Sequence, residues 1–215
     1  YVKTLRSPMD YVPLKDVIWD ETTISSRGII TDAQFFAFTN LSGNLVHSSL
    51  RKSEEFRKFI NRYLPQIAKC NIFTFENLKS CVKENQAMHN WLHMPACNGA
   101  FLDFLMSVNG EILKEFSKLP IYLDNTDKLC TSSDIYYCGD NIKQALVYLK
   151  AFVKYFPYLS FKTLEYFKTS NNTNWTKSWG TVGFKQLSAG EFVSKVLFST
   201  ANKSEVLSLL HNIDI

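Results

Sequence analysis

An apolar stripe between residues 142 and 156 is the feature of this sequence that most constrains how the chain folds. Its members recur at intervals of three and four residues, the spacing that places side chains on one face of an α-helix. They are Ile142, Ala145, Leu146, Leu149, Phe152, Val153 and Phe156. Pro157 follows the stripe, and proline cannot continue a regular helix. The pattern therefore predicts a helix over residues 142–156 with one face buried in a core.

Shorter elements are predicted on both sides of this helix. Thr31 with Gln34, and Ser188 with Glu191, have the spacing of capping boxes and predict helix starts. Helical spacing or capping also predicts helices at 53–65, 76–91, 101–116, 161–167 and from 202 onward, with a break at 95–99. Strands are expected at 71–75 and 181–187, and β-hairpins at 2–19 and 119–137. The expected fold class is α+β, rich in helices, with short β-hairpins packed on helices.

The two predicted hairpins resemble each other. Residues 10–19 match residues 127–137 in outline if one residue is inserted in the second segment. Each segment is followed by predicted helices, so the chain reads as two related hairpin-plus-helices units with a spacing of about 118 residues. We expect these units at 1–117 and 118–215. A chain of 215 residues is long enough for two small cores or for one compact domain.

The second hairpin carries a resemblance to a known family. Residues 119–122 read Leu-Pro-Ile-Tyr, a polar turn and a Lys-Leu pair follow, and residues 133–137 read Ser-Asp-Ile-Tyr-Tyr. This run resembles the recurring hairpins of very large sacsin-type proteins, which carry an Hsp90-like ATPase domain elsewhere, and residues 1–19 resemble it more loosely. The resemblance implies a non-catalytic segment of a chaperone-like ATPase protein. The glycine-rich motifs and the aspartate that bind ATP in that family have no counterpart here.

A metal site is the sharpest chemical hypothesis that the sequence offers. His89, His93 and Cys97 follow one another at four-residue spacing, and two histidines at this spacing share one helical face, as zinc ligands can. Against this interpretation, Pro95 interrupts the helix before Cys97, and no fourth ligand is indicated. A Cys97 nucleophile with His93 as its base lacks a third, orienting group. We therefore assign no metal, cofactor or catalytic residue.

Paired carboxylates have sufficient structural explanations. Glu54 and Glu55 fall in the first turn of a predicted helix, where negative charge favours the helix dipole. Asp124 and Asp127 fall in a predicted turn, where aspartate is common. The glycine-rich nucleotide-binding motifs and the serine-hydrolase motif are also absent from the chain. The sequence therefore predicts no enzyme.

Cysteine content and hydropathy place the chain in the cytoplasm. The cysteines are odd in number and widely scattered, unlike the dense, even sets of small secreted proteins. They are Cys70, Cys81, Cys97, Cys130 and Cys138. No apolar run reaches the roughly 18 to 20 residues that span a bilayer, and no signal peptide is recognisable. We expect reduced thiols, no bound metal, no membrane partner and a chain that is part of a larger protein.

Positive charge is concentrated between residues 142 and 185. This region holds seven lysines and the single acid Glu165, and its lysines are interleaved with tyrosines and tryptophans. Such a surface can bind nucleic acid, although all its cations are lysines and the bidentate contacts of arginine are missing. The alternative is an ordinary solvated helix face opposite the apolar stripe. Candidate partner-binding residues are Trp175, Lys150, Lys154 and Lys177, and we expect Trp175 to be exposed and Trp179 to be buried.

Three functions remain open on this evidence. The preferred interpretation is a non-catalytic scaffold or protein-interaction domain of a larger protein, binding other domains of the same chain or a protein partner. The alternative is a nucleic-acid-binding module that uses residues 142–185. A third is a small enzyme whose site is assembled from residues that a single sequence cannot connect.

Overall fold

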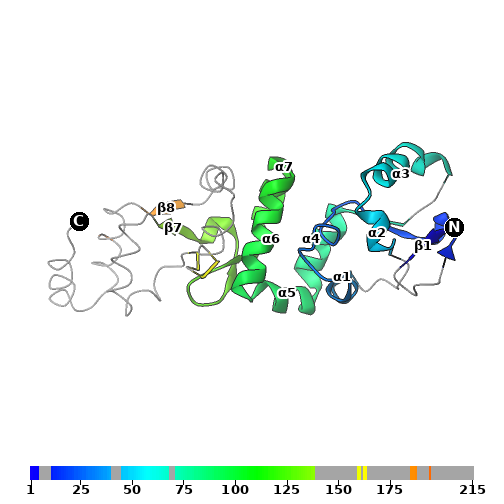
Figure 1. Ribbon diagram of the computed structural model, residues 1–215. Helices are drawn as coiled ribbons and strands as arrows, with labels where there is room; N and C mark the ends of the chain where they lie inside the picture. Colours follow the sequence, from blue (N-terminus) through cyan, green and yellow to red (C-terminus); the bar gives the residue numbers. More distant parts are fainter. Residues whose placement is uncertain are drawn as a thin grey trace. The chain divides into compact units, whose positions relative to one another are not determined.

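The computed structural model describes residues 1–4, 11–39, 45–67, 71–138, 159–160, 162–163, 185–187 and 194. The fold is α+β, with many helices and short strands, as the sequence predicts. The chain packs as two compact units, Tyr1–Asn90 and Trp91–Ile215 (Figure 1). The predicted 142–156 helix lies outside the described residues, and the repeat boundary at 117/118 stays a prediction. No helix in the described ranges is both long and apolar enough to cross a bilayer.

The first unit combines a hairpin, a parallel strand pair and four helices. Its elements are β1 (Val2–Lys3), β2 (Tyr11–Val12), the 3-10 turn η1 (Leu14–Asp16), β3 (Ile18–Asp20), α1 (Asp32–Thr39), α2 (Ser48–Arg51), α3 (Glu54–Ile67), β4 (Asn71–Phe73) and α4 (Phe75–Glu84). Strands β1 and β2 are antiparallel, whereas β3 and β4 are parallel. Single bridges of Thr4 with Val46 and of Ile18 with Leu45 connect the hairpin to β3.

Apolar side chains cover both faces of the β3–β4 pair, because successive residues of a strand point to opposite faces. On one face, Trp19 belongs to a buried cluster with Ile60 of α3, and its ring lies 5.8 Å from that of Phe56. On the other face, Phe73 meets Phe35 of α1 edge to face, with ring centroids 5.0 Å apart. Helices α3 and α1 therefore hold the short strand pair between them.

The second unit has a helical core and a second set of strands. Helix α5 (Gln86–Leu92) leads into it, followed by α6 (Pro95–Val108), α7 (Gly110–Ser117), β5 (Tyr122–Leu123), β6 (Leu129–Cys130), η2 (Ser132–Asp134), β7 (Tyr136–Cys138) and β8 (Lys185–Leu187). Strands β5 and β6 are antiparallel, and β7 and β8 are parallel. Phe101 of α6 is fully buried and contacts Phe116 of α7 edge to face.

The strand scheme of the first unit recurs in the second. Elements β2, η1 and β3 begin 118 residues before β6, η2 and β7, respectively. In both units the last of these strands pairs in parallel with a strand from far along the chain. Equivalent backbone hydrogen bonds close each copy. They are Val46 N to Ile18 O (3.2 Å) and His47 N to Lys3 O (2.9 Å) in the first unit, and Leu159 N to Tyr136 O (3.2 Å) and Ser160 N to Leu123 O (2.9 Å) in the second.

The predicted hairpins at 2–19 and 119–137 are confirmed as β1–β2 and β5–β6, but they end at Val12 and Cys130. Each segment begins as a hairpin, but a 3-10 turn then redirects the chain, and the next strand pairs in parallel elsewhere. The turn is closed by Asp16 N to Pro13 O at 2.9 Å in the first unit and by Asp134 N to Thr131 O at 3.2 Å in the second. Local alternation shows that a segment is extended, but it does not reveal a distant partner.

The helix predicted over residues 76–91 is two helices in the structure. It breaks at Asn85 between α4 and α5, because the Asn85 side chain binds the backbone of both the first turn of α5 and the end of α1. Its oxygen accepts a hydrogen bond from Met88 N at 3.0 Å, and its amide nitrogen donates to Ala37 O at 3.0 Å and Phe38 O at 2.9 Å. Asn85 thereby fastens the start of α5 to the end of α1.

Three other helix boundaries differ from the prediction. Pro95 begins α6 instead of breaking a helix, since proline fits the first helical position. The helix predicted at 101–116 ends before Asn109, whose side chain caps α7 by accepting from Glu111 N at 2.7 Å. Helix α3 continues past Pro65 to Ile67, so this proline forfeits a backbone hydrogen bond without ending the helix.

Candidate functional site

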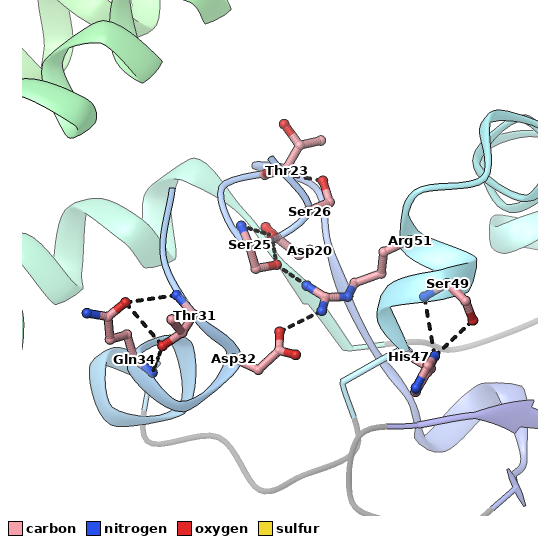
Figure 2. Close-up of polar contacts among 10 residues, drawn as sticks. All are labelled: Asp20, Thr23, Ser25, Ser26, Thr31, Asp32, Gln34, His47, Ser49 and Arg51. Carbon is pink, nitrogen blue, oxygen red and sulfur yellow. Dashed lines mark hydrogen bonds and ion pairs between the residues drawn. The ribbon is translucent and has the colours of Figure 1, made fainter. Parts of the chain in front are cut away.

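A cluster of polar side chains, all but one of them buried, lies where β3 ends. We call it the Arg51 cluster, and its members are Asp20, Thr22, Ser25, Asp32 and Arg51. Strand β3 carries Asp20 into the interior, and the turn that follows folds Thr22 and Ser25 back over its carboxylate. Asp32 begins α1 and Arg51 ends α2, so the cluster joins three elements of the first unit (Figure 2).

The hydrogen bonds of the cluster form a chain from one carboxylate to the other. Asp20 accepts at one oxygen from the Thr22 hydroxyl (2.5 Å) and at the other from the Ser25 N–H (3.2 Å) and hydroxyl (2.6 Å). Arg51 donates to the Ser25 oxygen and, at 2.6 Å, to Asp32. Figure 2 shows the Arg51 side chain reaching from α2 between Ser25 and Asp32. Ser25 therefore bridges a carboxylate and a guanidinium.

This arrangement suits a structural role better than catalysis. A serine that donates to a carboxylate has the start of a nucleophilic constellation, but Ser25 is only 7% exposed and its oxygen already accepts from Arg51. Arg51 is buried between the carboxylates of Asp20 and Asp32. Of its three guanidinium nitrogens, only Nε has no hydrogen-bond partner among the described residues. The cluster fastens β3, α1 and α2 together.

Two clefts open on the two faces of the β3–β4 pair. The α3-face cleft, of about 320 Å³, is lined by Trp19, Glu21, Arg57, Asn61 and Ile72. The α4-face cleft, of about 230 Å³, is lined by Ile72, Phe73, Asn77, Ser80 and Cys81. Ile72 lines both clefts and is 41% exposed. The strand pair thus presents open space on both faces at β4.

The residues of the zinc hypothesis are engaged individually. The His89 Nε2 atom contacts the Val82 carbonyl oxygen, and the His93 Nδ1 atom lies 2.9 Å from the Asp127 carbonyl oxygen. Cys97 lies in α6, where burial raises the pKa of its thiol. In the described ranges, three or more His, Cys, Asp or Glu side chains nowhere gather around a point that could hold a metal ion.

The paired carboxylates have structural partners. Glu54 forms an ion pair with Lys58 at 2.9 Å. The pKa of Glu55 lies below its ordinary value, because the Glu55 carboxylate accepts hydrogen bonds from the Glu55 backbone N–H and from the Ser53 side chain. Asp124 is buried in the β5–β6 turn and accepts from the N–H groups of Thr126 (2.7 Å) and Lys128 (2.9 Å). These contacts agree with the turn and helix-end roles expected from the sequence.

The candidate partner-binding residues Trp175, Lys150, Lys154 and Lys177 lie outside the described residues, and so does Trp179. Their exposure and the nucleic-acid interpretation of residues 142–185 therefore stay predictions.

Sequence reasoning missed Asp20, Ser25 and Arg51. A weak signal was present, because Asp20 directly follows the apolar residues Val17, Ile18 and Trp19 and precedes the turn-forming Thr22 and Ser25. Nothing local distinguishes Arg51 from a surface residue.

Comparisons with protein-family models, curated proteins and solved structures found no match.

Cys130 is expected to resist alkylation. Burial and the nearby Asp124 raise the pKa of its thiol to about 11, and its sulfur lies 3.7 Å from an Asp124 oxygen. Since the thiolate is the reactive form, labelling by iodoacetamide at pH 8 should be more than about tenfold slower in the folded chain than in urea. Because the thiol ionises near pH 9 in the unfolded chain but only near pH 11 in the folded chain, the free energy of unfolding should fall as the pH rises from about 9 to about 11.

Peptide mass spectrometry of the labelled chain measures this rate for each cysteine. Cys97 is the internal comparison, because burial alone raises the pKa of its thiol. Equal labelling rates of Cys130 in the folded chain and in urea would contradict the prediction.

Proposed function

We propose that this chain is a non-catalytic scaffold or protein-interaction domain of a larger protein. The observation that carries the proposal is the recurrence of one backbone scheme, a hairpin, a 3-10 turn and a parallel strand, in both units. Repeated backbone architecture without repeated side-chain chemistry is typical of modules that present surfaces, because function resides in specific sites and not in the fold.

The Arg51 cluster illustrates this difference between the units. Asp20 ends β3, and the residue that ends β7 at the equivalent position, 118 residues later, is Cys138. A buried carboxylate in one unit is thus replaced by a thiol in the other, while the strand pairing is retained. The polar interior of the first unit therefore supports its own packing and is no shared reaction centre.

The wider setting of the domain is part of the same proposal. Following the resemblance of its hairpins to sacsin-type proteins, we place it in a larger, chaperone-like ATPase protein, where it binds other domains of the chain or a protein partner. A cytoplasmic location agrees with the free thiols of Cys81, Cys97 and Cys130, because reducing compartments keep cysteines unpaired.

Selection from a random-peptide display library against the folded chain tests this function. We expect a family of related peptides to be enriched and to bind the folded chain with micromolar affinity, but not the chain unfolded in urea. Failure to enrich any peptide, together with salt-dependent binding of single-stranded oligonucleotides, would overturn the proposal in favour of a nucleic-acid-binding module.

A further inference from the structure

Strand β4 is the edge of its strand pair. It pairs with β3 along one side, and within the described residues no strand pairs with its other side. An open edge of this kind offers backbone N–H and C=O groups to another extended segment. Its central residue, Ile72, is apolar and 41% exposed, so the edge also has an uncovered hydrophobic surface. An open edge with an exposed apolar side chain can bind another extended segment.

The clefts on both faces match the geometry of an added strand. In the parallel register Trp19 lies opposite Ile72, so both side chains face α3, while Phe73 faces the α1 and α4 side. A strand laid along β4 would direct alternate side chains into the α3-face cleft and the α4-face cleft. Ile72 lines both clefts, so its side chain lies between them at this edge.

Charge distinguishes the α3-face cleft. Arg57 is exposed at this cleft and makes no ion pair among the described residues. Its neighbours on the exposed side of α3 are engaged, since Lys58 pairs with Glu54 at 2.9 Å and the Arg62 guanidinium lies 5.4 Å from the centre of the Tyr63 ring.

Two carboxylates also line the α3-face cleft. Glu21 is exposed there, and Asp20 is buried, with its oxygens occupied by Thr22 and Ser25. Among the residues that line this cleft, Arg57 is the cation, so its guanidinium is the charged group that can bind an incoming carboxylate, and the Asn61 amide is a neutral donor beside it.

We propose that β4 accepts an extended polypeptide segment as an additional strand, with an aliphatic side chain on Ile72 and a carboxylate on Arg57. The side chains between these two are small and polar and enter the α4-face cleft, where Asn77 and Ser80 provide hydrogen-bonding groups. The proposal rests on the interaction function proposed above and names its binding edge and the chemistry of its partner. A segment with alternating aliphatic and acidic residues on one face fits this edge.

Fluorescence polarisation with two labelled peptides tests the proposal. The acidic probe is Val-Thr-Glu-Thr-Val-Thr-Glu, and the control probe has lysine in place of both glutamates. We expect the acidic probe to bind at least about tenfold more tightly than the control probe. Arg57→Glu should weaken its binding at least about tenfold, whereas Lys83→Glu, a matched change at an exposed lysine of α4, should have little effect.

A second variant and hydrogen exchange locate the binding edge. Ile72→Asp replaces an exposed side chain, so the fold should survive while binding of the acidic probe is lost. The Ile72 amide should become protected when the probe binds, because Phe73 O accepts from Glu21 N and the backbone groups of Asn71 and Phe73 therefore face β3. The proposal is overturned if Arg57→Glu and Ile72→Asp leave binding unchanged, or if no peptide binds and the Ile72 amide is already protected in the free chain.

Peptides enriched by the library selection separate this inference from the proposed function. If these peptides bind the folded chain but neither Arg57→Glu nor Ile72→Asp weakens their binding, β4 is not the binding edge, whereas the proposed interaction function is supported. If the selection enriches no peptide and single-stranded oligonucleotides bind in a salt-dependent way, the proposed function fails as well. Binding of a single-stranded oligonucleotide that Arg57→Glu weakens, without peptide binding, would also overturn the proposal.

Discussion

Replacing Arg51 with methionine is expected to lower the free energy of unfolding of the first unit by about 3 kcal/mol. Arg51 is 3% exposed and is the cation between two carboxylates, bound directly to Asp32 and through Ser25 to Asp20. Methionine retains much of the side-chain volume but leaves the buried negative charge of Asp20 without a neighbouring cation. Removing one partner of a buried charged network costs more than removing all of it, because the remaining groups stay desolvated.

Urea denaturation measures the change, and hydrogen exchange shows where it acts. The amides of α1 and α2 should lose protection first, since Asp32 and Arg51 lie on these helices. The control is Lys52→Met at the next residue, which is exposed and should change the unfolding free energy by less than about 0.5 kcal/mol. A loss below about 1 kcal/mol in Arg51→Met would show that the cluster does not hold the unit together.

A double variant separates the two links of Arg51. Asp32 retains 39% side-chain exposure, so the coupling of the Arg51–Asp32 pair should be only about 1 kcal/mol in a double-mutant cycle. Most of the Arg51→Met effect should therefore persist when Asp32 is alanine, because it arises at Ser25 and Asp20.

Features set by neighbouring residues could be predicted from the sequence. The capping box at Thr31 is confirmed, because Gln34 N donates to the Thr31 hydroxyl at 3.2 Å and Thr31 N donates to the Gln34 side chain at 2.8 Å. The strand expected at 71–75 is present as β4 (Asn71–Phe73), and the described residues of the strand expected at 181–187 form β8 (Lys185–Leu187). In each case the signal lies within a few residues, where spacing and side-chain type decide the outcome.

Features set by distant residues could not be predicted in this way. The parallel partner of β3 lies more than fifty residues further along the chain, and Asn85 breaks a helical pattern because it binds Ala37 and Phe38. Local propensity favours one continuous helix there, but these tertiary hydrogen bonds outweigh it.

The α3-face cleft also depends on contacts between residues that are far apart in the sequence. Arg57 and Ile72 become neighbours in one cleft only when α3 packs on the β3–β4 pair. In the sequence, Arg57 is one of several charges on an amphipathic helix, and Ile72 is an ordinary strand residue. Only the structure shows that the isoleucine is exposed and that the arginine faces an open cleft.

Phe101→Ala should have the largest effect in the second unit, a loss of about 4 kcal/mol in unfolding free energy. The Phe101 ring is fully buried and meets Trp91 at 6.1 Å and Phe116 at 6.1 Å, both edge to face. Alanine would leave a cavity that three separate elements line. Because rings on α5, α6 and α7 converge on this one side chain, the surrounding helices cannot close the cavity without losing their other contacts.

The measurement is urea denaturation combined with hydrogen exchange of α6 and α7. Met94→Ala is the control, because Met94 precedes α6 and is 47% exposed, so its truncation should cost less than about 1 kcal/mol. A loss below about 2 kcal/mol in Phe101→Ala would mean that the helices collapse onto the vacated space. The aromatic contacts would then not be the main support of this core. A loss near the expected value would instead identify Phe101 as the residue through which α5, α6 and α7 stabilise one another.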